Sequence, residues 1–103
     1  MEKELIGKKV IIRSDRAGVF YGTLEETEPC GDKLSVKLTN CRRIWYWDGA
    51  ASLSQLAKDG TTSPSSCKFT VVVDEIVVCG VIEIIPCTEA ACKSIEKVSI
   101  WKR

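Results

Sequence analysis

Residues 18–24 read Gly-Val-Phe-Tyr-Gly-Thr-Leu, and residues 34–38 read Leu-Ser-Val-Lys-Leu. Both stretches are rich in apolar side chains of the kinds that favour strands, and the second alternates apolar with polar residues. The glycines in the first stretch allow that strand to bend sharply. A proline, a glycine and an aspartate within residues 25–32 predict the turn that joins the two strands. The pair is typical of a small, strongly bent β-sheet.

Two further runs extend this predicted sheet. Val10–Arg13 is a β-branched run, and residues 41–48 read Cys-Arg-Arg-Ile-Trp-Tyr-Trp-Asp. We therefore expect four short strands, joined by tight turns, in the first half of the chain. Such a set favours a small, strongly bent sheet or a partial barrel of the SH3-like or Sm-like kind.

A helix is predicted after this aromatic run. Ser52 and Gln55 have the spacing of a capping box, apolar residues then fall on one helical face, and Gly60 stands where a helix would stop. Residues 60–66 are small and polar, so we expect a loop there. The helix should have about two turns, because only seven residues separate its predicted cap from Gly60.

The second half of the chain predicts two more strands and a second helix. The strands are expected at 68–73 and 76–85, and the second is so continuously apolar that it should be central or covered on both faces. Thr88 begins the helix, and four of its side chains should pack inward: Ala91, Cys92, Ile95 and Val98. The prediction is one domain over residues 1–103, of the α+β class, mainly β, with two short helices.

Composition narrows the range of functions. The chain carries 15 basic and 14 acidic residues, which argues against holding nucleic acid by bulk electrostatics. Its first residues are charged and lack the apolar core of a signal peptide. The longest nearly apolar run, Ile76–Ile82, is too short to span a bilayer. We expect a soluble, cytoplasmic protein that makes no membrane contact.

The cysteines and the missing histidine bear on metal sites and catalysis. Six cysteines lie at positions 30, 41, 67, 79, 87 and 92, no pair has zinc-knuckle spacing, and the chain has no histidine. We expect reduced thiols and no metal, with Cys79 and Cys87 as small core residues, or Cys87 at a strand end. No nucleophile or phosphate-binding motif is present. The prediction is a protein that is not an enzyme and needs no cofactor.

Candidate binding residues lie in Asn40–Ser52, which holds two of the three tryptophans. In a strand, Arg43, Trp45 and Trp47 would project from one face and Arg42 from the other. A guanidinium beside two indoles suits a flat, anionic ligand, because indoles stack on a base and arginine grips a phosphate. Trp45 and Trp47 are expected to stack on the ligand, and Arg42 or Arg43 to neutralise its phosphate.

The residues after the aromatic run supply a second candidate feature. Gly49, Ala50 and Ser52 bring small residues to a helix start, where free N–H groups can receive an anion. Structural explanations stay open for the whole stretch. The tryptophans could be core or interface residues, the arginines could pair with Asp48 or Glu25, and the small residues could serve close packing against the sheet.

A resemblance rests on three motifs. They are residues 42–57 (Arg-Arg-Ile-Trp-Tyr-Trp-Asp-Gly-Ala-Ala-Ser-Leu-Ser-Gln-Leu-Ala), residues 81–89 (Val-Ile-Glu-Ile-Ile-Pro-Cys-Thr-Glu) and residues 94–101 (Ser-Ile-Glu-Lys-Val-Ser-Ile-Trp). Together they resemble a family of small, largely uncharacterised proteins encoded by bacteriophages and prophages. Small phage proteins of this size class include inhibitors of bacterial immunity, of the anti-Thoeris or anti-CBASS type, that capture nucleotide second messengers as compact oligomers. The resemblance implies a place in the cytoplasm of the infected host.

The leading hypothesis is a binding protein that sequesters a cyclic ADP-ribose derivative or a cyclic dinucleotide. A domain this small cannot enclose a nucleotide in its own core, so we expect a homo-oligomer with sites between subunits. One alternative is a small barrel that binds single-stranded nucleic acid through the same aromatic residues. Another is a structural or host-protein-binding module without a small ligand. An enzyme using Asp48 or Glu25 as acid or base ranks last.

Overall fold

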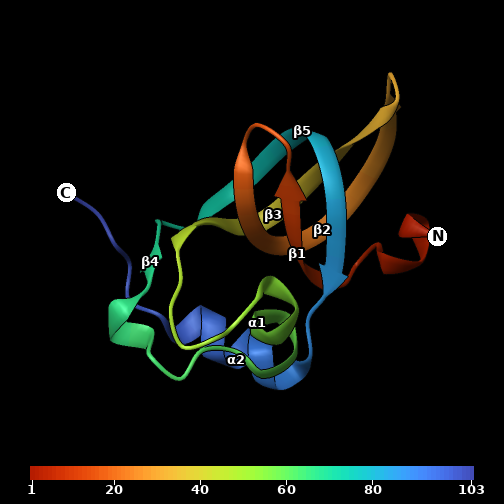
Figure 1. Ribbon diagram of the computed structural model, residues 1–103. Helices are drawn as coiled ribbons and strands as arrows, with labels where there is room; N and C mark the ends of the chain where they lie inside the picture. Colours follow the sequence, from red (N-terminus) through yellow and green to blue (C-terminus); the bar gives the residue numbers. More distant parts are fainter.

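About half of the chain is β-strand in the computed structural model, which describes all 103 residues (Figure 1). The elements, in chain order, are η1 (Glu2–Leu5), β1 (Lys9–Ser14), β2 (Gly18–Cys30), β3 (Lys33–Tyr46), α1 (Leu53–Asp59), η2 (Pro64–Ser66), β4 (Lys68–Phe69), β5 (Val73–Pro86) and α2 (Glu89–Lys97). η1 and η2 are short 3-10 helices. None of the helices is both long enough and apolar enough to cross a membrane.

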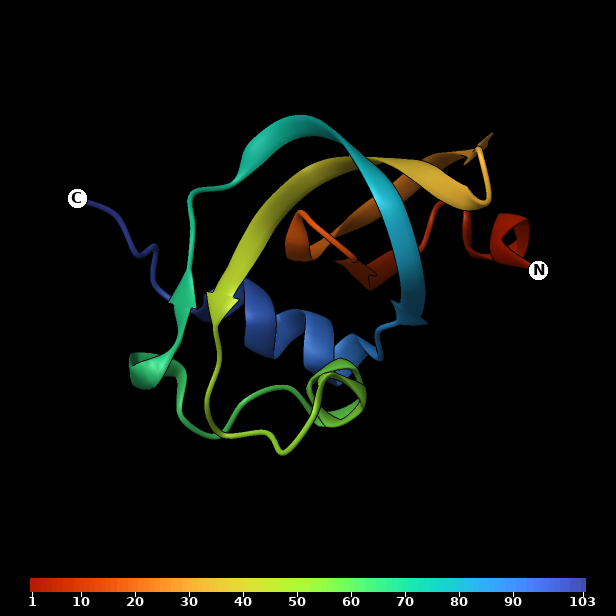
Figure 2. The same ribbon diagram turned by 45° about the horizontal axis from the view of Figure 1, so that its top comes forward.

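The strands form one five-stranded antiparallel sheet in the order β2-β1-β5-β3-β4, and β2 also pairs with β3. The register shifts within the β1–β5, β2–β3 and β3–β5 ladders, so the strands bend strongly and form a partial barrel rather than a regular closed one. Figure 2 shows the long strands arching over the two helices. The predicted fold class is confirmed: α+β, mainly β, with a strongly bent sheet and two short helices.

Two apolar clusters fill the fold, one on each face of β1. Val10 and Ile12 belong to the cluster enclosed by the bent sheet, together with side chains such as Leu38. Ile11 belongs to the cluster that the sheet shares with both helices, which includes Leu56. All five of these side chains are completely buried. β1 is thus covered on both faces, which explains why its sequence is an unbroken β-branched run.

β2 continues through the segment where the sequence predicted a turn. The turn expected within residues 25–32 is present but shorter than the sequence indicated, because β2 runs on to Cys30, which pairs with Lys33. Only Gly31 and Asp32 are left to connect the two strands. A long ladder satisfies the backbone N–H and C=O groups of both strands, and this outweighs the local turn preference of the residues.

β3 is one strand where the sequence predicted two. The strands expected at 34–38 and 41–48 are joined through Asn40, whose φ of 47° lies in the left-handed region. Asparagine tolerates this conformation better than most residues, so the strand bends there without ending. The bend lets the first part of β3 pair with β5 while its far end pairs with β4.

The last strands also differ from expectation. The strand expected at 68–73 ends at Phe69, while the run at 76–85 lies in β5, between β1 and β3 as predicted. Of the two alternatives expected for this run, the central position is observed; β5 is not covered on both faces, because the side chains of Val77 and Ile82 are 61% and 50% exposed. Cys79 is exposed rather than part of the core. The helices cover another part of the sheet, which leaves the outer face of β5 without a covering layer (Figure 1).

Both helices begin as predicted. The hydroxyl oxygen of Ser52 accepts from the N–H of Gln55 at 3.1 Å, and the hydroxyl oxygen of Thr88 accepts from the N–H of Ala91 at 3.1 Å. The Thr88 hydroxyl also donates to the carbonyl of Lys58 at 2.6 Å, which ties α2 to the end of α1. The four side chains expected to pack inward from the second helix are all buried: Ala91, Cys92, Ile95 and Val98. Cys87 is half-buried directly after β5 ends at Pro86.

The close approach of β2 and β3 at Gly22 predicts a sensitive position. A Cβ atom there would lie 2.6 Å from the Cβ of Cys41 and 3.1 Å from the carbonyl oxygen of Thr39. Gly22→Ala should lower the free energy of unfolding by about 1–3 kcal/mol, because neither backbone can yield. Gly31→Asn is the control, since nothing lies within 4 Å of Gly31 and asparagine accepts its φ of 64°. Urea unfolding measures the free energy of unfolding of both variants. Equal losses in the two would contradict a steric clash at Gly22.

Candidate functional site

The predicted aromatic run does not form a single surface. β3 ends at Tyr46, so Trp47 leaves the strand, and its half-buried side chain packs against the cluster beneath the helices. Trp45 remains on the strand and is 64% exposed. Arg43 and Trp45 therefore lie on the strand, as the alternation of side chains predicted. Trp47 does not, because the strand ends at Tyr46.

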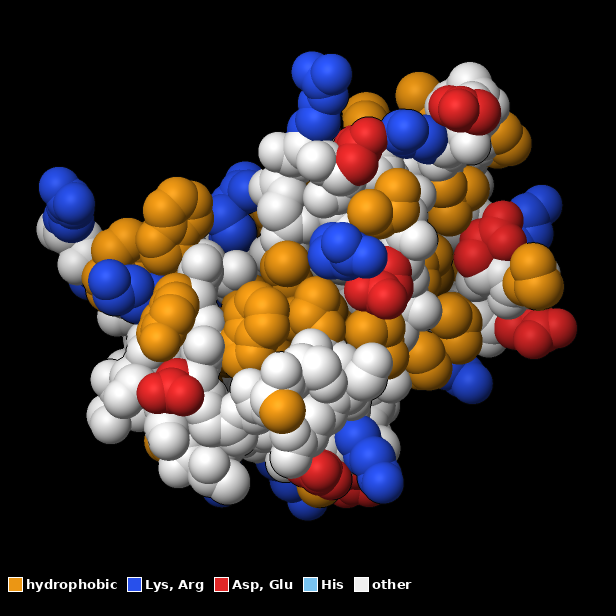
Figure 3. All heavy atoms as spheres, viewed as in Figure 1, with side chains coloured by type: hydrophobic (Ala, Val, Ile, Leu, Met, Phe, Trp, Pro, Cys, Tyr) orange, Lys and Arg blue, Asp and Glu red, His pale blue; other side chains and the backbone are white.

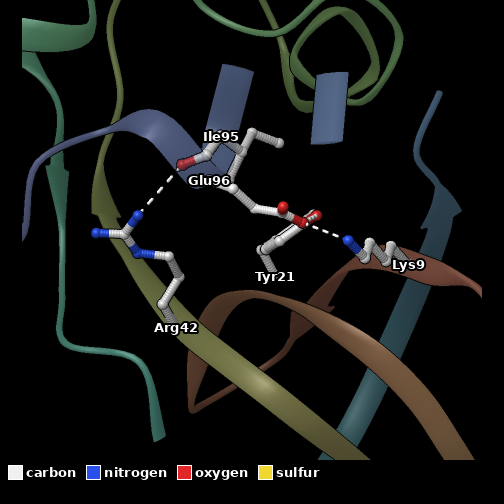
Figure 4. A network of polar contacts seen from close by, with 5 residues as sticks. All are labelled: Lys9, Tyr21, Arg42, Ile95 and Glu96. Atoms are coloured by element: carbon white, nitrogen blue, oxygen red, sulfur yellow. Dashed lines mark hydrogen bonds and ion pairs between the residues drawn. The ribbon is translucent and has the colours of Figure 1, made fainter. Parts of the chain in front are cut away.

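Arg42 is a buried side chain, 4% exposed. Its Nη1 donates to the carbonyls of Ile95 and Val98 at 3.2 and 2.9 Å. Its Nε and Nη2 donate to the carbonyls of Thr70 and Phe69 at 3.0 and 3.1 Å. Figure 4 shows the guanidinium reaching the end of α2. Arg42 thus supplies a donor to the Val98 carbonyl at the helix end and a second donor to the Ile95 carbonyl, which also accepts from the N–H of Val98, and its positive charge lies where the helix dipole favours it.

Arg43 is also engaged within the fold. Its Nη1 donates to the carbonyl of Ala17 at 2.5 Å, and its guanidinium lies 4.4 Å from the centre of the Phe20 ring. Cation–π contact and the carbonyl bond both direct it toward β2 and the β1–β2 turn. The structure therefore does not place either arginine of the predicted pair beside the exposed indole of Trp45.

Trp45 instead has an aromatic neighbour from the other end of the sequence. The rings of Trp45 and Trp101 are nearly parallel, with centres 6.3 Å apart and planes at 10°. The ammonium of Lys68 lies 5.5 Å from the centre of the Trp101 ring. We call these three residues the aromatic platform. Figure 3 shows hydrophobic side chains flanked by lysine and arginine side chains at the edge of the molecule from which the C-terminal segment extends.

Trp101 is positioned by the backbone of β4. Its N–H donates to the carbonyl of Phe69 at 2.8 Å, and Ile100 forms a parallel bridge with Phe69. Trp101 is 36% exposed, so one side of its ring is available together with that of Trp45. The platform is therefore an open surface held by strand contacts on both sides.

The residues after the aromatic run are engaged with the neighbouring loop. The carbonyl of Gly49 accepts from the N–H of Thr62 at 3.2 Å, and a Cβ at Gly49 would lie 2.5 Å from the nitrogen of Ser63. The N–H of Ala51 donates to the side chain of Gln55 at 2.7 Å. Gly49 thus permits a close packing of two chain segments, and the capping box occupies N–H groups at the start of α1.

The short segment around Ala50 has a similar structural role. Ala50 packs against the apolar cluster beneath the helices, and the Ser52 hydroxyl caps α1. The polar loop at 60–66 lies against the same segment, since the hydroxyl of Thr61 donates to the carbonyl of Asp48 at 2.5 Å. Among the predicted site residues, only Trp45 and the capping residue Ser52 are thus exposed.

A second feature, which the sequence did not indicate, is a polar cavity of about 270 Å³. It is lined by Lys9, Tyr21, Gly22, Thr23, Asn40, Arg42, Val72 and Glu96. The Glu96 carboxylate accepts from the Lys9 ammonium at 2.7 Å and from the Tyr21 hydroxyl at 2.5 Å (Figure 4). Burial raises the pKa of Tyr21, and the neighbouring Cys92 and Glu96 raise it further. The Tyr21 hydroxyl therefore stays protonated and acts as a donor to Glu96.

Comparison with known proteins identifies the family but not its function. A family model described as "Domain of unknown function (DUF6948)" matches residues 7–95. The chain belongs to the DUF6948 family. No curated protein and no solved structure matches it. The matched residues of the DUF6948 chain include Trp45, Lys68 and every residue that lines the polar cavity except Glu96, and Trp101 also lies outside them.

Both features of this DUF6948 chain depend on contacts between distant parts of the sequence. Lys68 and Trp101 meet Trp45 only because β4 pairs with β3 and the C-terminal segment bridges to Phe69. Trp101 could have been singled out as the third tryptophan, but no local pattern links it to the aromatic run. The polar cavity carried no signal at all, because its residues lie in five separate stretches.

Replacing Arg42 is expected to cause a large loss of stability. Arg42→Met keeps most of the apolar stem but removes four hydrogen bonds and leaves the carbonyls of Thr70 and Val98 without their donor, so the free energy of unfolding should fall by about 2–4 kcal/mol. Arg13→Met is the matched control, because Arg13 makes a partly exposed ion pair with Glu83, a class worth about 0–1 kcal/mol. Urea unfolding compares them; similar losses would show that Arg42 does not hold α2.

The ion pair of Glu96 is expected to make the protein less stable in acid. Burial alone would raise its pKa, but hydrogen bonds from Lys9 and Tyr21 and the charge of Lys9 outweigh burial and hold the pKa below its ordinary value. The stabilisation is then complete above the ordinary glutamate pKa of about 4.3 and disappears as the pH falls through the lower folded-state pKa. Urea unfolding at a series of pH values should show this, and Glu96→Gln should flatten part of the fall. Glu89→Gln, at an exposed pair with Lys93, should not.

Proposed function

We propose that this DUF6948 protein is a non-catalytic binding protein that holds a nucleotide-derived small molecule against the aromatic platform. The observation that carries the proposal is the exposed indole of Trp45, which lies parallel to Trp101 with Lys68 over the neighbouring ring. The two indoles are stacked, so the exposed ring face of Trp45 is left to suit a base, and an ammonium group suits a phosphate. Stacking of a base on an aromatic side chain is worth about 1–3 kcal/mol.

Rigidity supports this role for Trp45. Its strand neighbours Ile44 and Tyr46 pair with Phe69 and Lys68 in β4, so the backbone beneath the indole is fixed by the sheet. Trp101 is held by its own backbone bond to Phe69. A surface that is already formed before binding avoids part of the entropy lost when flexible side chains are ordered.

The openness of the platform bears on oligomerisation. Tight small-molecule sites bury about 70–90% or more of the ligand, and an open platform contacts only one side of a flat ring. We therefore propose a homo-oligomer in which a second copy of the chain covers the other side. The exposed apolar residues of β5, including Val77 and Ile82, offer area for contact between copies.

The resemblance to small bacteriophage and prophage proteins supplies the biological part of the proposal. A cyclic ADP-ribose derivative or a cyclic dinucleotide combines a flat base with phosphate, which is the chemistry that the platform suits. Binding such an immune signal without cleaving it would sequester the signal in the cytoplasm of the infected host and so inhibit anti-phage defence. This role needs no catalytic group and depends on affinity alone.

One observation favours a second candidate, binding of single-stranded nucleic acid. The platform is open at its edges, so it would also accept successive bases of a strand. The nearly equal numbers of basic and acidic residues in the chain, 15 and 14, favour the small molecule.

Calorimetry separates these possibilities. The full chain is titrated with cyclic ADP-ribose, with 3′,3′-cyclic di-AMP and with a single-stranded thymidine oligonucleotide. Trp45→Ala and Trp101→Ala should each weaken binding of the cyclic nucleotide by about 10- to 100-fold, since each removes one stacking surface. Ile6→Ala, at an exposed apolar residue outside both the platform and β5, is the control and should leave binding unchanged.

The same samples test the absence of catalysis and the nature of the ligand. Intact nucleotide should be recovered after the protein is denatured, and altered nucleotide would point to an enzyme. Binding of the oligonucleotide alone, with a steep dependence on salt, would favour the second candidate. Equal affinity of wild type and Trp45→Ala for every ligand would contradict the platform as a binding site.

A further inference from the structure

The polar cavity is separate from the aromatic platform. Arg42 and Ile44 on β3 are buried beneath the strand, whereas Trp45 projects outward from its other face. The cavity is bounded by β1, β2, β3 and α2, and the platform by β3, β4 and the C-terminal segment. A ligand in one therefore does not need the other.

The charge of Arg42 is not balanced by a protein carboxylate. All four of its hydrogen bonds end on neutral carbonyl oxygens, and its guanidinium forms no ion pair. Four of the five guanidinium N–H groups are thereby used, and one on Nη2 has no protein acceptor. A buried charge is costly unless an opposite charge or a full set of hydrogen bonds compensates it. Arg42 has no opposite charge beside it, and one of its N–H groups lacks a hydrogen-bond acceptor.

The one acid in the cavity is already paired. Glu96 accepts hydrogen bonds from Lys9 and Tyr21, so its carboxylate is turned toward those groups (Figure 4). With Lys9 and Arg42 positive and Glu96 negative, the lining carries a net charge of about +1. An anion would complete the balance on the Arg42 side of the cavity.

Further donors line the cavity without protein partners. Neither the hydroxyl of Thr23 nor the side-chain amide of Asn40 makes a hydrogen bond to another protein group, although both line the cavity. Asn40 is held in this position by the kink in β3. Together with the remaining N–H of Arg42, they form a set of hydrogen-bond donors suited to an oxygen-rich anion.

We propose that the polar cavity binds a phosphate group through Arg42, Asn40 and Thr23, as inorganic phosphate or as the monoester of a small molecule. Arginine bonds phosphate in a geometry that also fixes its orientation, which favours phosphate over a spherical anion such as chloride. The cavity of about 270 Å³ is below the about 300–1,000 Å³ typical of drug-sized ligands, so it suits one phosphate group rather than a whole dinucleotide. The lowered pKa of Glu96 keeps that acid ionised and paired, so the phosphate lies away from it.

Nuclear magnetic resonance of the full chain tests the site directly. Inorganic phosphate and methyl phosphate are titrated separately at constant ionic strength while the Nε–H signal of Arg42 and the side-chain amide of Asn40 are followed. Saturable shifts of both signals are expected. Saturation by methyl phosphate as well would assign the site to a phosphate group of a larger molecule, and saturation by inorganic phosphate alone would assign it to the free ion.

Variants that spare Arg42 keep the fold intact during the test. Val72→Phe should fill the cavity and weaken phosphate binding by at least about 10-fold, since the larger ring sterically blocks access to the polar lining. Val71→Phe is the control, because Val71 lies in the same segment but lines a different hollow, beside Arg43. Thr23→Val removes only a hydroxyl and Asn40→Gly keeps the left-handed backbone, and each should weaken binding about 3- to 10-fold.

Several outcomes would overturn the proposal. They are shifts that do not saturate, shifts that chloride reproduces, or shifts that persist unchanged in Val72→Phe. Trp45→Ala should retain phosphate binding, because the platform lies on the other face of β3. Failure of the phosphate titration would thus leave the platform proposal standing, and failure of nucleotide stacking would leave this one standing.

Discussion

The guanidinium of Arg42 joins three separate parts of the chain: β3, residues 69–70 and the end of α2. From the middle of β3 it bonds the carbonyls of Phe69, Thr70, Ile95 and Val98. These bonds fix the end of α2 against the sheet and set the position of β4. Phe69 in turn holds Trp101, so the aromatic platform rests on the same anchoring point. The packing of the helices and the position of both candidate sites therefore follow from one buried cation.

The buried Arg42 side chain contributes both to the stability of the fold and to the proposed phosphate site. A neutral side chain of the same size could pack there, but it would leave the helix end without donors. The arginine satisfies those carbonyls and brings a positive charge to the wall of the polar cavity. Structural use and ligand binding draw on different N–H groups of the same side chain, so one role does not exclude the other.

Much of the fold could be predicted because its signals are local. Ser52 and Thr88 cap helices through residues three positions away, and the β-branched run at Val10–Arg13 marks a strand. The lengths of β2 and β3 could not be predicted, since turn-forming residues such as Pro29 were overridden by pairing with a long neighbour. Cys79 was misplaced because a continuous apolar run shows that a strand is apolar without showing whether another layer covers it.

The candidate site was predictable only in part, for the same reason. Strand alternation separated Arg42 from Trp45 correctly, but it failed for Trp47, because the strand ends one residue earlier. The partners of Trp45 and Arg42 lie between about 27 and 56 residues away along the chain, at Phe69, Val98 and Trp101. No periodicity reaches across such separations, so the polar cavity and the second half of the platform became visible only in three dimensions.

The pairing of β1 with β5 also has a consequence for biosynthesis. Val10 lies opposite Pro86, so one edge of the first strand stays unpaired until most of the chain has left the ribosome. Exposed strand edges and contacts between distant residues slow folding and invite association with other chains. Nascent chains of this protein therefore complete their sheet late in synthesis. Aggregation would be most favoured on polysomes, where several incomplete chains with unpaired strand edges lie close together.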